Sequence, residues 1–327
     1  MALQSTKFSA PGKVILFGEH SVVYGHPAIA TAVGLRAYCE VRKSDGRDII
    51  LSVPLLFNNQ LFVINENSVL PPELESLKHV IMLISNKHVK APPLNITITS
   101  DIPYSAGLGS SAATSVSLVA SLLEYYKEDY NLNLINEIAF ESEKITHGTP
   151  SGIDNTISTY GGGLLYENGI ITPIASKLSS SFLLIIESGV SRNTKDIVEK
   201  VRKMRVTNPD KTQSIFNKIS EITRDAKKHL ESGNIKAVGT LMNENHEQLV
   251  KLGVSTPILN NIIDLIDNTN ALGRKITGAG GGGSIIALYD NFEYAKEIAM
   301  NFTENLGYVT YPSKIFQLGV RIEEQTN

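Results

Sequence analysis

The sequence predicts an α+β fold, because strand and helix patterns are mixed along the chain without the strict alternation of a doubly wound sheet. Strand-like runs dominate the first 65 residues, whereas residues 194–270 are mostly helical in pattern. With 327 residues, 42% of them hydrophobic, the chain can bury a large core and is long enough for two domains. We expect domains over 1–175 and 176–327, because Pro173 and a Ser-rich stretch mark a boundary near 173–181.

In the first half, a group of strands precedes three helices. Strands are predicted at four apolar runs separated by Gly, Asp, Pro and Asn: 28–33, 37–42, 49–53 and 61–64. A helix over 72–89 opens at prolines and closes before Pro92, and an alternating strand follows at 94–99. After a loop rich in Gly and Ser, a long helix has apolar residues at spacings of three and four: Ala112, Val116, Val119, Leu123 and Tyr126. A further helix is expected over about 132–147.

The second half is mainly helical and closes with strands. Glycines at 161–163 break the chain before two short strands, 164–166 and 170–172. A strand at 182–187 then precedes the helical region 194–270. The last predicted elements are a strand at 284–289, a helix at 294–305, and strands near 308 and at 315–320.

Composition excludes several classes of function. The formal net charge of −3 gives no sign of a nucleic-acid or anionic-membrane surface. The single cysteine, Cys39, excludes an internal disulfide and a cysteine-based zinc site, and its strand-like surroundings predict a buried structural thiol. No apolar run reaches about 18 residues, so we expect neither a signal peptide nor a membrane span, and a cytoplasmic protein.

The most informative segment is the Gly-Ser loop, residues 103–113, which reads Pro-Tyr-Ser-Ala-Gly-Leu-Gly-Ser-Ser-Ala-Ala. Small residues directly before a helix let a ligand approach the backbone closely and leave N–H groups free at the positive end of the helix dipole. Such a site favours phosphate. The hydroxyls of Ser110 and Ser111 can add hydrogen bonds or a metal ligand.

The same loop satisfies the loose dinucleotide pattern Gly-x-Gly-x-x-Ala, from Gly107 to Ala112, with Asp129 about 20 residues on. Its context argues against that fold. Several residues intervene after the strand, and Asp129 lies between two predicted helices instead of ending a second strand. A Walker A loop is also excluded, because no Lys-Ser/Thr pair follows the last glycine.

Three other polar clusters can carry chemistry. The first spans residues 10–25, with Lys13 at one end of an apolar run and Glu19 and His20 at the other. Taken alone, Lys13 and His20 are more simply interpreted as surface residues. The last spans 275–284, where five glycines in six positions indicate either a tight structural turn or a ligand cradle.

The remaining cluster joins Glu143 to the segment 147–155. Glu143 shares a helix face with Ile135 and Ala139, and a carboxylate on such an apolar face is costly unless it is paired or binds a metal. A buried salt bridge or cap and a ligand-directed role both stay open. Asp154 follows a Pro-Ser-Gly turn, so helix N-capping is a serious alternative to a catalytic role.

Taken together and in this order, the motifs at 11–25, 103–113 and 275–284 resemble those of the small-molecule kinase superfamily of galacto-, homoserine, mevalonate and phosphomevalonate kinases. The first motif looks most like that of mevalonate kinases, since galactokinases carry Thr-Asp where this chain has Ser21-Val22 and homoserine kinases lack the Lys and Glu-His. Residues 147–162 and 191–195 are similar to mevalonate kinases too. The lack of long insertions fits a compact, archaeal-type form.

The resemblance implies a two-lobed kinase, with a ribosomal-protein-S5-like N-terminal lobe that binds the nucleotide and a ferredoxin-like C-terminal lobe that completes the substrate cleft. It implies ATP-dependent, Mg²⁺-assisted phosphorylation of the 5-hydroxyl of (R)-mevalonate in isoprenoid biosynthesis, and it allows a homodimer. A phosphomevalonate kinase, another small-molecule kinase of the superfamily and a non-catalytic ligand sensor on the same fold are the alternatives.

The resemblance also implies roles for individual residues. Asp154 would accept the proton of the substrate hydroxyl, and Lys13 would lie between that oxygen and the γ-phosphate. Ser111 and Glu143 would bind Mg²⁺. Mevalonate would be oriented by Glu19, His20 and Thr194. ATP would be bound by the whole Gly-Ser loop: Pro103, Tyr104, Ser105, Ala106, Gly107, Leu108, Gly109, Ser110, Ser111, Ala112 and Ala113.

Overall fold

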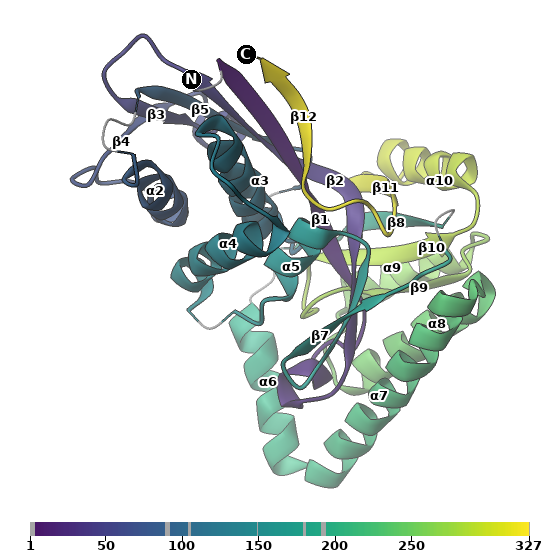
Figure 1. The fold of residues 1–327 in the computed structure, drawn as a ribbon. Coiled ribbons are helices and arrows are strands. Elements are labelled where there is room, and N and C mark those ends of the chain that lie inside the picture. Colours follow the sequence, from purple (N-terminus) through teal and green to yellow (C-terminus); the bar gives the residue numbers. More distant parts are fainter. Residues whose placement is uncertain are drawn as a thin grey trace.

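The computed structural model describes residues 4–88, 92–103, 106–148, 150–178, 181–190 and 194–326. In this part of the chain an eight-stranded sheet and a four-stranded sheet combine with helices, which confirms the predicted α+β class (Figure 1). None of the helices in these ranges is both long and apolar enough to cross a membrane.

The larger sheet is built around two long strands, β1 (Ser5–Phe17) and β2 (Ala28–Lys43), which pair antiparallel. Its main strand order is β12-β1-β2-β5-β3-β4, and β6 and β7 extend it from β2. The other strands are β3 (Ile49–Ser52), β4 (Leu61–Ile64), β5 (Leu94–Ser100), β6 (Gly163–Glu167), β7 (Ile170–Ile174) and β12 (Arg321–Thr326). Pairing in the described part is antiparallel except between β3 and β5, so the dinucleotide fold is absent there.

Helices cover one face of this sheet (Figure 1). The apolar face of α3 packs directly on β1 and β2, with Val116, Val119 and Leu123 fully buried, as the spacing predicted. The helical elements of this half are η1 (Ser21–Tyr24), α1 (Pro54–Phe57), α2 (Pro72–Ser85), α3 (Ser110–Tyr125), α4 (Leu132–His147) and α5 (Ile153–Tyr160). Cys39 is a buried free thiol on β2, and burial raises its pKa to about 12, which fits a structural role.

The smaller sheet has the order β11-β8-β10-β9 and is antiparallel throughout its described pairs. Its strands are β8 (Phe182–Glu187), β9 (Gly273–Ile276), β10 (Ser284–Tyr289) and β11 (Thr310–Lys314). Its helices are α6 (Thr194–Thr207), α7 (Pro209–Ser232), α8 (Ile235–Lys251), α9 (Pro257–Asp267) and α10 (Phe292–Glu304). Four helices connect β8 to β9, and α10 connects β10 to β11. The β-α-β-β-α-β connectivity confirms the predicted ferredoxin-like arrangement.

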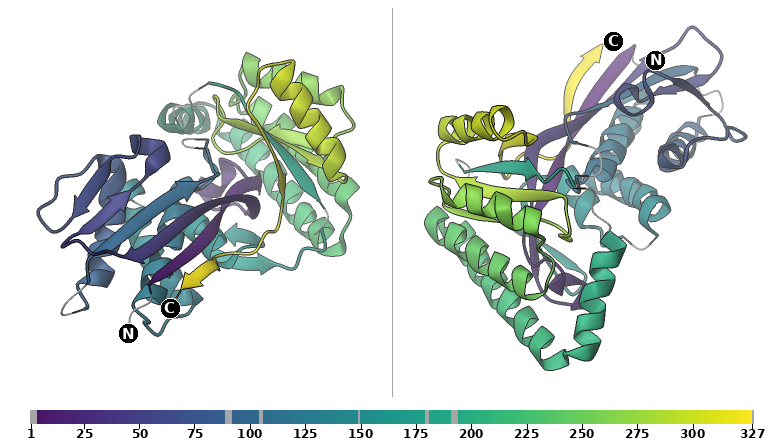
Figure 2. Two further views of the ribbon diagram at one scale, coloured as in Figure 1. Left: turned by 90° about the horizontal axis from the view of Figure 1, so that it is seen from above. Right: turned by 180° about the vertical axis from the view of Figure 1, so that it is seen from behind.

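The two halves of the chain share part of their core. Along β8, Leu183 and Ile185 belong to the large core that packs against the larger sheet. Leu184 and Ile186 point the other way, into a second core that includes residues of α9 and α10. The last strand, β12, pairs with β1, so both chain ends lie on the same side of the molecule (Figure 2). The division at residue 175 stays a prediction.

Several strand predictions were wrong or missing, and β9 and β12 are among the strands not predicted. The segments 28–33 and 37–42 form one strand, β2, which pairs with β1 on both sides of an irregularity at residues 33–35. Strand β1 itself was not predicted, since Pro11 and Gly12 interrupt its apolar pattern. The β1–β2 register shifts between Pro11 and Lys13, where β2 carries the extra residues, and β1 runs on as one strand.

Another error concerns residues 315–320, which connect the two sheets instead of forming a strand. They are apolar because Ile315 is buried between layers, and their backbone is held by a side chain: Arg36 Nη1 donates to Leu318 O at 2.9 Å, and Nη2 donates to Gly319 O at 2.6 Å. Helix α2 ends at Ser85, earlier than predicted, and Val89 lies outside the described residues.

Candidate active site

The Gly-Ser loop rests on β1 and opens into helix α3. The backbone N–H of Lys13 donates to Leu108 O at 2.7 Å, which fixes the loop against the strand. Gly109 is the N-cap of α3 with φ of 75°, and a Cβ atom there would lie 2.9 Å from Lys13 Cγ. The N–H groups of the first turn of α3, before Ala113, have no intrahelical partner, so they are available to an anion.

The predicted loop residues differ in what they expose. Four have buried side chains, so they can offer a ligand only their backbone: Ala106, Leu108, Ala112 and Ala113. Five others are partly exposed: Pro103, Gly107, Gly109, Ser110 and Ser111. Tyr104 and Ser105 lie outside the described residues.

Lys13 and Asp154 form an ion pair beside this loop. The distance from Lys13 Nζ to Asp154 Oδ1 is 3.1 Å, and the two side chains are 11% and 35% exposed. Lys13 is therefore not the solvated surface lysine that its sequence context favoured. Asp154 lies in the first turn of α5, whose N-cap is Gly152, so the N-capping alternative is wrong.

Glu143 projects from the apolar face of α4 toward the N-terminus of α3. It is buried, and Ser111 Oγ donates to its Oε1 at 2.7 Å. Burial raises the pKa of Glu143 and the Asp154 carboxylate raises it further, whereas Ser111, His147 and Lys13 oppose the shift. A carboxylate in this position gains from a nearby cation.

Two oxygen donors suit Mg²⁺, which prefers oxygen ligands and completes its shell with phosphate and water. In the part of the chain that the structure describes, no cluster of three or more His, Cys, Asp or Glu side chains offers an all-protein metal site. A hard cation shared with a phosphorylated ligand therefore fits Ser111 and Glu143 better than a resident structural metal does.

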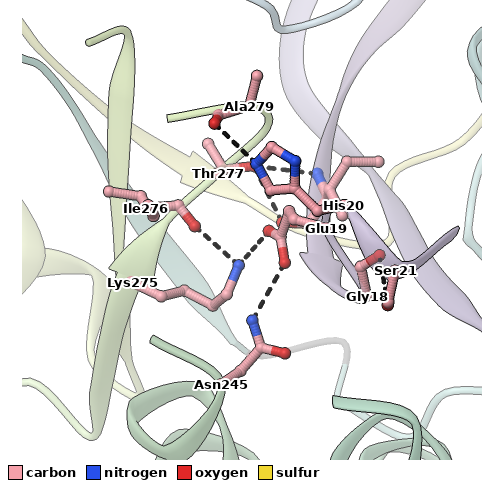
Figure 3. A network of polar contacts seen from close by, with 10 residues as sticks. Gly18, Glu19, His20, Ser21, Asn245, Lys275, Ile276, Thr277 and Ala279 are labelled. Atoms are coloured by element: carbon pink, nitrogen blue, oxygen red, sulfur yellow. Dashed lines mark hydrogen bonds and ion pairs between the residues drawn. The ribbon is translucent and has the colours of Figure 1, made fainter. Parts of the chain in front are cut away.

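The Glu19–His20 corner, which directly follows β1, is held by the second half of the chain (Figure 3). Glu19 is buried, forms an ion pair with Lys275, and accepts a hydrogen bond from Asn245 Nδ2 at 3.1 Å. His20 is also buried, so the surface interpretation is wrong, and its Nε2 lies 2.8 Å from Ala279 O. Burial lowers the pKa of His20. Thr194 is exposed at the first residue of α6.

The glycine-rich segment 275–284 connects the other motifs. Thr277 Oγ1 donates to Ile15 O at 2.9 Å, two residues from Lys13 on β1. Ser284 Oγ donates to Ala106 O in the Gly-Ser loop at 3.4 Å. The Gly281 N–H donates to Val254 O at 2.8 Å, so protein backbone supports the glycine turn. These contacts favour a structural turn that packs against the Gly-Ser loop. A direct contact between the glycine-rich segment and a ligand stays a prediction.

A cavity of about 730 Å³ opens beside the Gly-Ser loop and was not predicted from the sequence. Residues from α1, α2, β5 and α4 line it, together with Ser110, Ser111 and Thr114 of α3. Its apolar wall includes Leu56, Leu74, Leu77, Ile98, Ile102 and Ile145. No local pattern marks such a cavity, because its walls come from elements far apart in the sequence.

Comparisons with known proteins match both halves of the chain. The family model for the GHMP kinases N terminal domain matches residues 75–163, and that for GHMP kinases C terminal matches residues 226–307. The mevalonate kinase of Thermococcus sibiricus is 33% identical over 330 residues, covering 97% of this chain and 98% of the relative. That of Arabidopsis thaliana is also 33% identical, covering 86% and 90%.

Solved structures agree with these relatives. The mevalonate kinase of Methanococcus jannaschii superposes with a TM-score of 0.83 at 30% identity, over 95% of this chain and 98% of that chain. The L. major mevalonate kinase in complex with R-mevalonate gives a TM-score of 0.83 at 27% identity, over 97% and 99%. The full length of the chain therefore follows one architecture.

Proposed function

Because the chain belongs to the GHMP kinase family, we propose that it transfers the γ-phosphoryl group of ATP to the 5-hydroxyl of (R)-mevalonate, a step of isoprenoid biosynthesis. Membership confirms the resemblance that the three sequence motifs carried, and kinases of this family use ATP. The observation that carries the proposal is the Lys13–Asp154 pair beside the N-terminus of α3, within a chain similar to mevalonate kinases over nearly its full length.

The nucleotide would occupy two adjoining features. Its phosphates would accept hydrogen bonds from the free N–H groups at the start of α3, where the helix dipole favours negative charge. Its adenosine would fill the cavity between α2 and β5, which is large enough and mainly apolar and opens at Ser110 and Ser111. This placement leaves the γ-phosphate at the Lys13 side of the loop.

Ser111 and Glu143 would hold Mg²⁺, because they offer a hydroxyl and a buried carboxylate on the same side of the loop. When bound, Mg²⁺ neutralises charge that develops on the transferred phosphoryl group. Glu143 would remain ionised in this state, since a cation opposes the effect of burial on its pKa.

Asp154 would accept the proton of the 5-hydroxyl as its oxygen attacks phosphorus. The Lys13 ammonium, 3.1 Å from the carboxylate, would keep Asp154 ionised and stabilise the developing alkoxide. Most of the acceleration would come from positioning and electrostatics, since phosphoryl transfer requires little covalent participation by the protein.

His20 would recognise a hydroxyl of mevalonate. A carbonyl oxygen only accepts hydrogen bonds, so Nε2 must carry the proton that Ala279 O accepts. In the neutral ring, Nδ1 is then an acceptor, which suits a hydroxyl and not a carboxylate. The roles of Glu19 and Thr194 in binding mevalonate stay predictions, as do the cytoplasmic location and the homodimer.

A turnover assay with ATP, Mg²⁺ and a panel of acceptors tests the proposal. Mevalonate should be phosphorylated, and phosphomevalonate, galactose and homoserine should not. Preference for phosphomevalonate would assign the chain to the neighbouring kinase. Binding of ATP and mevalonate without turnover would indicate a non-catalytic sensor.

A further inference from the structure

We propose that Lys275 and Asn245 are positioning residues for substrate binding: together they hold Glu19, and through it the strained turn that presents His20. The proposal rests on the proposed kinase activity toward mevalonate. It concerns two side chains of the second half of the chain, which meet Glu19 from β9 and α8 (Figure 3).

The His20 turn has an unusual backbone. The Ser21 N–H donates to Glu19 O at 2.7 Å, which closes a three-residue turn centred on His20. His20 has φ of 62° and ψ of −48°, close to the rare γ-turn that only a strained L-residue adopts. Such a conformation persists only where the surrounding structure imposes it.

The contacts that hold His20 in this conformation come from the second half of the chain. Both oxygens of the Glu19 carboxylate are bound: Oε1 by the Lys275 ammonium from β9, and Oε2 by Asn245 Nδ2 from α8. The His20 ring donates to Ala279 O, in the glycine turn that follows β9. Glu19 and the central residue His20 are therefore both fixed to the second half of the chain, across more than 220 residues of sequence.

Lys275 is fully buried and has one further partner, Ile276 O at 2.8 Å. Burial lowers the pKa of Lys275, and the Glu19 carboxylate opposes the shift, so the Lys275 charge depends on Glu19. A buried ion pair adds little stability over apolar residues of similar volume, because desolvation offsets the attraction. The ion pair instead fixes the position of Glu19, and in this way it fixes the orientation of the His20 side chain toward the site.

The test compares a double variant that removes the Glu19 and Lys275 charges with a control double variant that removes another ion pair of the same strand, β9. The double variant Glu19→Gln/Lys275→Met removes both buried charges while keeping side-chain volume. We expect its melting temperature within about 5 °C of the wild type. Its KM for mevalonate should rise about 10-fold or more, as for a lost polar contact, and its KM for ATP should stay within about twofold.

The control is Asp267→Asn/Arg274→Met, which removes the neighbouring ion pair between α9 and β9, where Arg274 Nε lies 2.6 Å from Asp267 Oδ1. It should leave both KM values unchanged. A further variant, Asn245→Leu, removes the second Glu19 contact without changing charge. It also removes a buried amide oxygen that has no partner, which offsets part of the cost of leaving Glu19 Oε2 unpaired. Its KM for mevalonate should rise and its KM for ATP should not.

The outcomes separate the proposals. Unchanged mevalonate KM in a folded double variant, or in Asn245→Leu if the double variant fails to fold, would reduce the network to a structural role. An equal rise in both KM values would overturn the positioning role as well. Failure of the proposed function is visible separately, because the wild-type enzyme would then not phosphorylate mevalonate at all.

Discussion

Replacing Asp154 with Asn separates its proposed role as a base from its place in the fold. Asparagine keeps the size of the side chain and an oxygen that can accept a hydrogen bond from Lys13, but it has no basic carboxylate. The change is therefore confined to one negative charge in the first turn of α5, 3.1 Å from Lys13 Nζ.

The expected effect on folding is small. At an effective dielectric constant of about 20, two unit charges 3.1 Å apart attract by roughly 5 kcal/mol. The Asp154 side chain is 35% exposed, so solvent screening reduces the net contribution to about 1 kcal/mol. A loss of that size lowers the melting temperature by only about 2–4 °C.

The expected effect on catalysis is larger. A positioned general base contributes about 10²- to 10⁴-fold, or roughly 3–5 kcal/mol of the activation barrier. Asp154→Asn should therefore lower kcat by at least 100-fold while ATP affinity and melting temperature change little. A coupled assay, a thermal melt and calorimetric titration with ATP measure the three quantities.

Asp225→Asn is the matched control, because Asp225 pairs with Lys228 on an exposed face of α7. It should have wild-type turnover. If Asp154→Asn keeps more than about a tenth of wild-type kcat, the base is another group. If its melting temperature falls by much more than a few degrees, the Lys13–Asp154 pair is primarily structural.

Three further variants test other parts of the protein. Glu143→Gln should raise the Mg²⁺ concentration for half-maximal rate, because it removes the proposed carboxylate ligand; an unchanged magnesium titration would leave Glu143 structural. Gly109→Ala should weaken ATP binding more than mevalonate binding in calorimetry, since φ is 75° and the added Cβ would meet Lys13 Cγ at 2.9 Å; equal losses would indicate misfolding. Burial lowers the pKa of His246 from 6.5 to about 4, so the unfolded chain takes up this proton first and stability falls as the pH drops from 6.5 to 4, by about 3 kcal/mol. His246→Gln should flatten that part of the curve of unfolding free energy against pH, and an unaltered slope would assign it to other groups.

The sequence predicted the fold class and most helices because these depend on local periodicity. The apolar face of α3 and the inward position of Glu143 followed from spacings of three and four along a helix. Strand β1 could not be found this way, since Pro11 and Gly12 break its pattern and only pairing with β2 and β12 keeps it extended. Residues 315–320 were misassigned for the opposite reason: they are mainly apolar, and Ile315 is buried, without forming a strand.

The environments of individual site residues were also beyond the sequence. Lys13 and His20 are polar residues at the ends of an apolar run, a pattern that fits surface exposure as well as burial. Their burial depends on Asp154 and Ala279, which lie more than 140 residues away along the chain. The same holds for Asn245, which has no motif around it and became relevant only when α8 was seen beside Glu19.

The contacts of the glycine-rich segment explain why three motifs so far apart in the sequence act at one place. Lys275 binds Glu19 on the proposed substrate side, and Thr277 binds Ile15 on the strand that carries Lys13. Ser284, at the far end of the segment, contacts the carbonyl of Ala106 on the proposed phosphate side. A displacement of this segment would therefore disturb both substrates' sites together, whereas loss of the Glu19 contacts alone would disturb only one. The predicted difference between the Glu19/Lys275 variant and Gly109→Ala follows from that geometry. The first variant should weaken the binding of mevalonate by His20, and the second should weaken the binding of ATP beside Lys13.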